Sequence, residues 1–457
     1  MPQQQPDSRL RSLLVEAGWS GQQLAQKVNA LGAEAGLTLR YDRTSVAHWL
    51  AGSTPRPPVA ELIAEAFSRQ LNRRIEAAVH GVPARGDVPG DPRRPENLFA
   101  TFGGSGEADA AARLVELVAG RRRAPGGGVY SVAALAVPGW IQASTAPPSP
   151  SGATRAVRSD RIGREHAVAA EAMTRVFSDA DCAYGGGRTV GALAAYLAVD
   201  VSPRLRARAS PAVRQAMLRA ATELAYLCAF MCFDQERHPA AQQYYTVALQ
   251  LSAENNDPAA YATTLRALSV QANHLGHHRQ AIDLADAAVR TAPATSPPGT
   301  RAFLHGQAAV AAAGIGDRRT ALAHLTRAES LLERGATAGA TSGAYHQASL
   351  GHQRAAVLEA LGDAQGAAEA LTASLRHRPA AERRARALTL AALAQMHLRQ
   401  GRLEPAVATW QKFLEDYPHL ESGRARTAHA TLRATLRPHQ RTPVVAAVWA
   451  QSAAMGR

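Results

Sequence analysis

Residues 271–293, QANHLGHHRQAIDLADAAVRTAP, decide the fold of this chain. Gly276 interrupts a helical pattern and permits a turn. Small side chains follow on one face of the next helix, at Ala281, Ala285 and Ala288, and Pro293 ends that helix. Because small residues at fixed crossing points let two helices approach closely, the stretch predicts an antiparallel helical hairpin.

The same pattern recurs along the C-terminal half. Gly316, Gly362 and Gly401 each precede an alanine by five residues, and successive turn glycines lie 39 to 46 residues apart. An earlier unit places Ala241, Tyr245 and Ala248 after a helix that ends near Phe233. Repetition of one hairpin at a near-constant spacing is typical of tetratricopeptide-type repeats. The sequence therefore predicts an α-solenoid.

A solenoid exposes a continuous concave surface that is lined by the first helix of each hairpin. This groove is the expected site for a peptide, small-molecule or protein effector, because its lining would mix aromatic, amide and cationic groups. Taken singly, each residue is better interpreted as an ordinary solvated or packing residue, and only the group points to a binding surface. The candidates in register are Tyr226, Phe230, Arg266, Asn273, His274, His352, Gln395 and Arg399.

The N-terminal 80 residues predict a separate small helical domain. Ser20 is placed to cap one helix, and Asp42 is placed to cap the next. In that second helix Val46, Trp49 and Leu50 recur at the spacing of a buried face. Gly52 then supplies a left-handed stop.

The opposite face of the helix after Asp42 has the composition of a DNA-reading surface. Thr44, Ser45 and His48 offer short polar groups, Ala47 adds a methyl group, and Arg43 stands at the helix start. Such a face can approach base edges closely in a major groove and exchange hydrogen bonds with them. We therefore expect double-stranded DNA as a partner.

These residues resemble a known family. SGQQLA at 20–25, TSVAHWLAG at 44–52 and PRP at 55–57 resemble the helix-turn-helix domain of the Cro/repressor-like class. DCAYGGGR at 181–188 and ATELA at 221–225 are similar to actinobacterial regulators of development and antibiotic production that carry tetratricopeptide repeats.

The resemblance implies transcriptional control, often repression, by a homodimer. It implies that Gln22 contacts backbone or an edge base, that Thr44, Ser45 and His48 face bases, and that Arg43 and Arg56 meet phosphates. One departure concerns the fourteen residues from Asn29 to Asp42, which separate the core of the second helix from the recognition helix. We expect a connection longer than the usual tight turn there.

The expected architecture is all-α. It comprises a helix-turn-helix domain (1–80), a flexible Pro/Gly/Ser-rich linker with a short apolar segment (81–160), the tetratricopeptide-like repeats (161–437) and a C-terminal capping helix (438–457). Within the linker, Arg121–Arg123 precede an apolar run to Ile141 and resemble a twin-arginine export signal. Its internal position and Pro138 favour a linker that docks on a neighbouring element.

Composition is consistent with a non-membrane, cytoplasmic protein. Hydrophobic residues make up 46% and aromatic residues 5%, and the formal charge is +14. Residues 1–80 contribute little of that charge, with nine Arg/Lys against seven Asp/Glu. Three cysteines, with Cys228 and Cys232 on one helical face, predict small buried thiols and no disulfide framework.

No enzymatic, metal or cofactor motif is recognisable in the sequence. Gly276 places a turn between His274 and His278, which argues against a shared metal, and Gly185–Gly187 are interpreted as a helix-terminating turn and not as a phosphate loop. The leading hypothesis is thus an effector-gated transcriptional regulator. The alternative is a tetratricopeptide interaction scaffold whose N-terminal domain serves protein docking.

Overall fold

The computed structural model describes residues 8–35, 37–55, 58–71, 75, 110–123, 129–137, 139–141, 161–335 and 345–455. The regular elements of these ranges are helices. One isolated β-bridge pairs Arg161 with Arg208. The chain forms two compact units. The N-terminal unit comprises 1–107, 119–138 and 238–242, and the repeat unit comprises 108–118, 139–237 and 243–457. The all-α prediction is confirmed.

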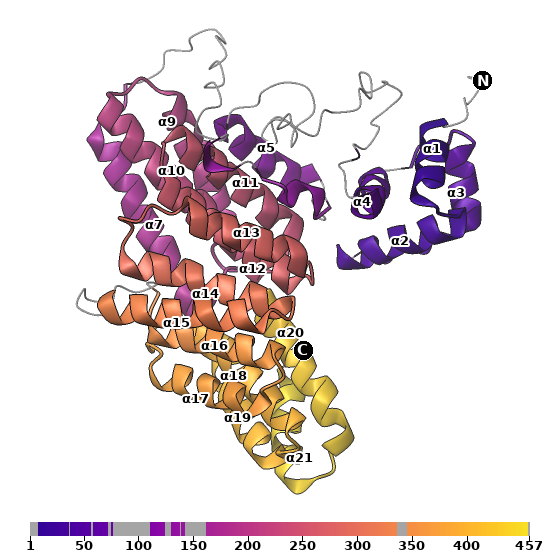
Figure 1. The fold of residues 1–457 in the computed structure, drawn as a ribbon, viewed down its shortest axis with the longest axis vertical. Coiled ribbons are helices and arrows are strands. Elements are labelled where there is room, and N and C mark those ends of the chain that lie inside the picture. Colours follow the sequence, from indigo (N-terminus) through magenta and orange to yellow (C-terminus); the bar gives the residue numbers. More distant parts are fainter. Residues whose placement is uncertain are drawn as a thin grey trace. The chain divides into compact units, whose positions relative to one another are not determined.

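The N-terminal unit contains the helices α1 (Ser8–Ala17), α2 (Gly21–Glu34), α3 (Arg43–Leu50) and α4 (Val59–Leu71) (Figure 1). Their apolar faces share one core, in which Leu24, Val46 and Phe67 are fully buried. Trp19 closes this core against Phe67, with ring centroids 5.3 Å apart. The apolar face that the sequence pattern gives to each of these helices is thus buried in the same core.

The connection between α2 and α3 is shorter than the sequence analysis predicts. Helix α2 continues to Glu34, so only residues 35–42 link it to α3. Asn29 lies on α2 and exchanges two hydrogen bonds with the backbone of Tyr41, both 2.8 Å long. The connection is therefore shorter than the fourteen residues expected, but with eight residues it is still longer than a tight turn.

The apolar segment after residue 128 packs within the N-terminal unit. Glu65 of α4 is buried and accepts a hydrogen bond from the backbone N–H of Val132 at 2.7 Å. Arg69 pairs with Glu65 at 2.8 Å and also donates to the carbonyl of Tyr130 at 3.5 Å. A short 3-10 turn, η2 (Ala133–Leu135), follows with two buried side chains. The segment thus supplies partners to a buried carboxylate.

The repeat unit is a stack of antiparallel helix pairs (Figure 1). A first helix and a second helix make each pair, and successive pairs contact one another, as a solenoid requires. The pairs are α12 (Pro258–His274) with α13 (His278–Thr291), α14 (Pro298–Gly314) with α15 (Arg318–Gly335), α16 (Gln347–Ala360) with α17 (Ala364–Arg376), and α18 (Arg383–Arg399) with α19 (Leu403–Asp416).

Left-handed backbone at one residue closes each of these pairs. Gly276, Gly316, Gly362 and Gly401 have φ between 71° and 84°, a conformation that glycine adopts without steric cost. The turn glycines of the sequence analysis are therefore confirmed. In the preceding turn, between α10 (Pro211–Asp234) and α11 (His238–Glu254), the corresponding residue is Glu236, with φ of 59°.

Further helices extend the stack at both ends. α7 (Arg164–Tyr184) packs against α10 and α18, and α21 (Pro443–Ala454) packs against α19 and α20 (Gly423–Leu436). The remaining elements are α5 (Ala110–Arg123), α8 (Val190–Tyr196), η3 (Leu197–Val201), α9 (Ser202–Arg206), η4 (Tyr417–His419) and η5 (Arg437–His439).

Helix α10 is the one described helix that is long and apolar enough to cross a bilayer by length and composition. Of its apolar window, 67% is buried inside the protein, as in the core helix of a globular unit. Cys228 and Cys232 lie on this helix and are buried, which agrees with the prediction of small buried thiols.

We predict that Gly316→Ala lowers the free energy of unfolding of the repeat unit by about 1 kcal/mol, because alanine is strained at positive φ. A Cβ at this glycine would meet no atom within 4 Å, so the backbone is the sole source of the cost. Gly299→Ala is the matched control, because it also meets no atom within 4 Å and lies in the first turn of α14. Urea unfolding should separate the two variants, and equal stabilities would contradict the role of the turn.

Candidate nucleic-acid interface and ligand groove

Helix α3 is fixed at its N-terminus by a capping box. The Asp42 carboxylate accepts hydrogen bonds from the backbone N–H and the hydroxyl of Ser45, both at 2.8 Å. These bonds lower the pKa of Asp42, because they favour its charged form. At the other end Gly52 has φ of 102° and the Ser53 N–H returns to the His48 carbonyl at 3.0 Å. Both predicted helix ends are therefore present.

The two faces of α3 are sharply divided. Val46 and Trp49 are buried, and the Trp49 ring meets Tyr41 edge-on at 5.1 Å. The exposed side chains of the other face are Arg43, Thr44, Ala47 and His48. Ser45 is half-buried because its hydroxyl belongs to the cap, so it is less available to a partner than its position predicts.

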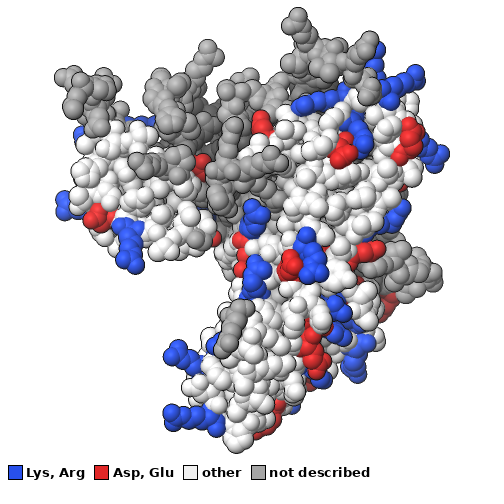
Figure 2. Space-filling model, turned by 180° about the vertical axis from the view of Figure 1, so that it is seen from behind, with Lys and Arg blue, Asp and Glu red and all other residues white. Residues whose placement is uncertain are grey.

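Two further DNA-contact candidates of the N-terminal unit lie outside α3. Gln22 is exposed in the first turn of α2. Arg56 lies outside the described residues. The surface of the repeat unit seen in Figure 2 carries blue and red side chains side by side, so its charge is interspersed there. The electrostatic case for a polyanionic partner therefore depends on individual side chains of the N-terminal unit.

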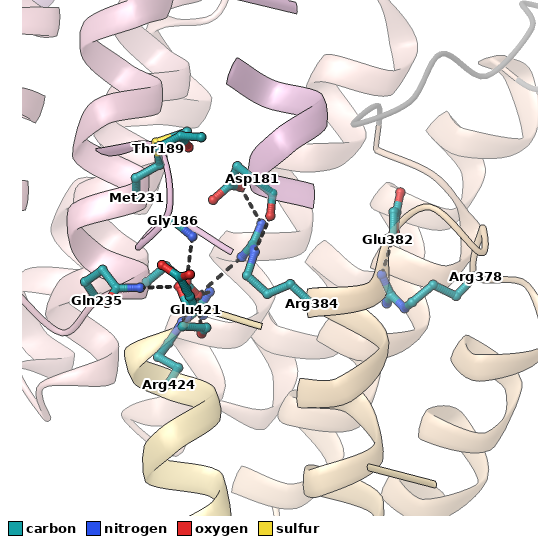
Figure 3. A network of polar contacts seen from close by, with 12 residues as sticks. Asp181, Gly186, Thr189, Met231, Gln235, Arg378, Glu382, Arg384, Glu421 and Arg424 are labelled. Atoms are coloured by element: carbon teal, nitrogen blue, oxygen red, sulfur yellow. Dashed lines mark hydrogen bonds and ion pairs between the residues drawn. The ribbon is translucent and has the colours of Figure 1, made fainter. Parts of the chain in front are cut away.

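A network of hydrogen bonds and ion pairs surrounds the carboxylate of Asp234 at the end of α10, and Figure 3 labels its members Asp181, Gly186, Arg384 and Arg424. Asp234 is fully buried and accepts hydrogen bonds from Arg424 at 3.0 Å, from the Ser422 hydroxyl at 2.9 Å and from the Gly186 N–H at 3.1 Å. Burial raises the pKa of Asp234, but Arg384, Arg424 and the Gly186 N–H outweigh burial and lower it overall. This carboxylate therefore joins α10 to α20 and to the loop after α7. We call the set Asp181, Gly186, Asp234, Arg384, Ser422 and Arg424 the closure network.

Arg384 extends the closure network to α7. It donates to the Asp181 carboxylate at 2.7 Å and lies 3.6 Å from the carboxylate of Asp234. Its guanidinium also lies over the Phe230 ring, 4.7 Å from the centroid. Burial raises the pKa of Asp181, and Arg384 opposes this effect only in part. Side chains from α7, α10, α18 and α20 thus meet at one point, although they are far apart in the sequence.

The three glycines after α7 make this meeting possible. Gly185 ends the helix with φ of 84°, which agrees with a helix-terminating turn. A Cβ on Gly186 would lie 2.7 Å from the backbone of Met231, and one on Gly187 would lie 2.7 Å from the carbonyl of Glu421. The Gly187 N–H donates to that carbonyl at 2.8 Å. Only glycine permits so close a backbone approach.

The predicted groove residues lie on the first helices of the stack. Tyr226 and Phe230 are on α10, Arg266, Asn273 and His274 on α12, His352 on α16, and Gln395 and Arg399 on α18. We call the partly exposed side of these helices, together with the equivalent side of α14, the first-helix face. Because Phe230 on α10 touches Arg384 on α18, the stack curls with this face inward.

Several groove candidates are occupied by neighbouring side chains. Phe230 lies against Arg384 of the closure network, Asn273 bonds to His278 at 2.8 Å, and Arg399 pairs with Glu359. His274 meets the Phe233 ring edge-on at 5.4 Å, Tyr226 meets Tyr245 at 5.7 Å, and His352 bonds to Thr389 at 3.1 Å. Arg266 instead stacks on Phe303, with 3.7 Å between its Cζ and the ring centroid.

Sequence reasoning missed Asp234, Arg384 and Arg424. The available signal was weak, since each has other charged residues beside it in the sequence, such as Glu236, Arg386 and Arg426, and nothing local marks one of them as central. Their partners lie as far as 203 residues away, as between Asp181 and Arg384, and no local spacing connects them. Phe303 and Tyr345, which share the first-helix face with Arg266, were missed for the same reason.

We predict that Asp234→Ala destabilises the repeat unit by about 3–5 kcal/mol, because it leaves the buried Arg384 and the half-buried Arg424 without this partner. Thermal unfolding followed by circular dichroism would measure the loss. Asp283→Ala is the control, because it removes an exposed carboxylate from α13 and should change stability by less than about 0.5 kcal/mol. Similar effects of the two substitutions would contradict a central role for the closure network.

A second prediction concerns pH. Burial, with Arg378 and Arg424, lowers the pKa of His352 from 6.5 to about 4. The unfolded chain therefore binds a proton near pH 6.5 that the folded chain binds only near pH 4. The free energy of unfolding carries no penalty from this histidine above pH 6.5, and it decreases as the pH falls from 6.5 to about 4. His352→Gln should flatten the fall of stability between pH 7 and 5, although His305, whose pKa is also lowered to about 4, retains its share. Urea unfolding at a series of pH values would measure this dependence. If the free energy of unfolding of the variant falls as steeply with pH as that of the natural chain, the prediction is contradicted.

Comparison with known proteins identifies the first of the two regions. Residues 10–83 match the family described as the SP15 N-terminal domain. No curated protein matches the chain. The chain therefore consists of an SP15 N-terminal domain followed by a long, all-helical, repeat-like region.

Proposed function

We propose that this protein is a sequence-specific DNA-binding transcriptional regulator, acting as a repressor of developmental or secondary-metabolism genes in the cytoplasm. An effector bound by the repeat unit would gate its activity. The proposal assigns no enzymatic activity, cofactor or membrane role. The single observation that carries it is the exposed face of α3, where Arg43, Thr44, Ala47 and His48 project from a helix whose other face is buried.

The chemistry of that face supports base readout. Threonine and histidine side chains can donate and accept hydrogen bonds at base edges, and the Ala47 methyl group permits close approach. Arg43 stands at the helix N-terminus, where a phosphate would meet both the guanidinium and the helix dipole. The capping box leaves this end well ordered without using Thr44 or His48.

The resemblance to actinobacterial repeat-containing regulators supports the repressor role and the homodimer. Two copies of α3 in a dimer would need to sit about one turn of DNA, ~34 Å, apart to read a palindromic operator. An effector that favours one arrangement of the repeat units would shift the population able to bind DNA. Its affinity for the two arrangements must differ for such gating to work.

Selection of bound duplexes from a random pool by the full chain tests the proposal. We expect one enriched sequence, whose binding weakens as salt increases because cationic side chains displace counterions. Thr44→Ala and His48→Ala should each weaken binding to that duplex by roughly 5- to 100-fold, the cost of one lost base contact. Ser45→Ala is a poorer test, because it also removes the cap.

Val15→Ser is the matched control, since Val15 is a highly exposed residue of α1 outside the α3 face, with 79% exposure. It should bind like the natural chain. Circular dichroism must show that all variants remain folded. If no duplex is enriched, or if both α3 variants bind normally, the DNA-reading function is wrong and the interaction scaffold is the better interpretation.

A further inference from the structure

Arg266 is the centre of an aromatic cluster on the first-helix face. Its guanidinium lies 3.7 Å from the centroid of Phe303 on α14, and the Phe303 ring lies 5.2 Å from Tyr345, just before α16. All three side chains are partly exposed. Three consecutive helix pairs therefore contribute to one accessible patch, which we call the Arg266 site.

The neighbouring cations of the stack are paired, and Arg266 is not. Arg378 pairs with Glu382 at 2.8 Å, Arg384 with Asp181 at 2.7 Å, and Arg424 with Asp234 at 3.0 Å. Arg266 makes no hydrogen bond or ion pair with a described residue, and its Nε is buried without a partner. A desolvated N–H donor without an acceptor costs about 1–3 kcal/mol, so the described surroundings of this guanidinium do not satisfy it.

The geometry of stacking leaves the donors of Arg266 available. A guanidinium that lies flat on a ring directs its N–H groups along its own plane, away from the ring. Such an edge matches the two oxygens of a carboxylate. The ring below also provides an apolar surface beside the charge.

The walls of the site are held in place. The Tyr345 hydroxyl donates to the Gln353 Oε1 at 2.5 Å. A Cβ on Gly306 would lie 2.1 Å from that oxygen and 2.5 Å from the Tyr345 hydroxyl, so the glycine gives both groups their room. The Tyr345 ring is therefore oriented by neighbours of α14 and α16, and a ligand does not have to order it.

The charges around the Arg266 site favour a ligand that carries a single negative charge. Glu329, the carboxylate that acts on Tyr345, already pairs with Arg354 at 2.9 Å. Burial raises the pKa of Tyr345 and of Tyr245, so both phenols stay neutral and leave the positive charge of Arg266 uncompensated. Burial also lowers the pKa of His274 and of His352, with Arg424 as the next cause for His274 and Arg378 for His352, so both stay neutral.

We propose that the Arg266 site binds a small aromatic monocarboxylate, with its carboxylate on the edge of the Arg266 guanidinium and its ring beside Phe303 and Tyr345. This inference deepens the proposed function by naming the chemical class of the effector, and it relies on that function only for the consequence of binding. Binding itself needs no DNA.

Calorimetry and thermal unfolding of the full chain with phenylacetate, indole-3-acetate and 1-naphthoate test the proposal. At least one acid should bind and raise the melting temperature, whereas the corresponding primary amide should bind at least tenfold more weakly. Arg266→Gln should weaken binding of that acid at least tenfold. Arg266→Lys should also weaken it, because lysine keeps the charge but loses the planar fork.

Arg290→Gln is the matched control, because it removes an exposed arginine from α13, a second helix, and should leave binding unchanged. The unliganded variants must unfold at similar temperatures. The proposal is overturned if no acid binds, if acid and amide bind equally, or if Arg266→Gln binds like the natural chain. Binding of a hexapeptide with a free C-terminal carboxylate, but of none of the small acids, would also overturn it in favour of a peptide ligand.

The two proposals fail separately. If the acids bind at Arg266 but no duplex is enriched, the ligand site stands and the DNA-reading function is wrong. If a duplex is enriched and no acid binds, the regulator stands and its effector belongs to another chemical class.

Discussion

The repeat unit depends on one buried carboxylate. Asp234 stands at the end of α10 without solvent exposure, and a buried charge is tolerated only when opposite charges and hydrogen-bond donors surround it. Arg424 comes from α20, Arg384 from α18 and the Gly186 N–H from the loop after α7. To satisfy this single group, helices from the beginning and the end of the stack must meet. The curvature of the repeats is thus set by electrostatics as well as by apolar packing.

The same curvature decides which part of the first-helix face is accessible. The closure network places Arg384 and Arg424 against Phe230, so this part of the first-helix face stabilises the fold and is not open to a ligand. Arg266, Phe303 and Tyr345 lie farther along the stack, where no carboxylate reaches the guanidinium of Arg266 among the described residues. The face therefore has a structural part and an open part, which share the same helices but differ in how their cations are neutralised.

Much of the architecture could be predicted from local sequence, whereas the closure could not. A turn glycine and a following row of alanines lie within one hairpin, and the same holds for a helix cap such as Asp42 with Ser45, so the pattern is visible at short range. Asp234 and Arg424 are 190 residues apart, and each lies beside other charged residues, so the local sequence does not reveal its partner. The length of the α2–α3 connection was overestimated for a related reason, because α2 continues to Glu34 and its Asn29 holds Tyr41 from twelve residues away. The outward face of α3 was predictable because burial of Val46 and Trp49 fixes the direction of their neighbours.

The turn after α10 combines a backbone cost with a side-chain contact. Glu236 has φ of 59°, which costs a residue with a Cβ about 1–2 kcal/mol, and the later turns place glycine at the equivalent point. Local bonds close this turn, from the Glu236 N–H to the Phe233 carbonyl and from the Arg237 N–H to the Cys232 carbonyl, both 2.9 Å long. The Glu236 side chain accepts a hydrogen bond from Thr427 of α20 at 2.8 Å. A side chain at this position therefore carries a backbone cost that glycine would avoid, but it supplies a contact to α20 that glycine could not make.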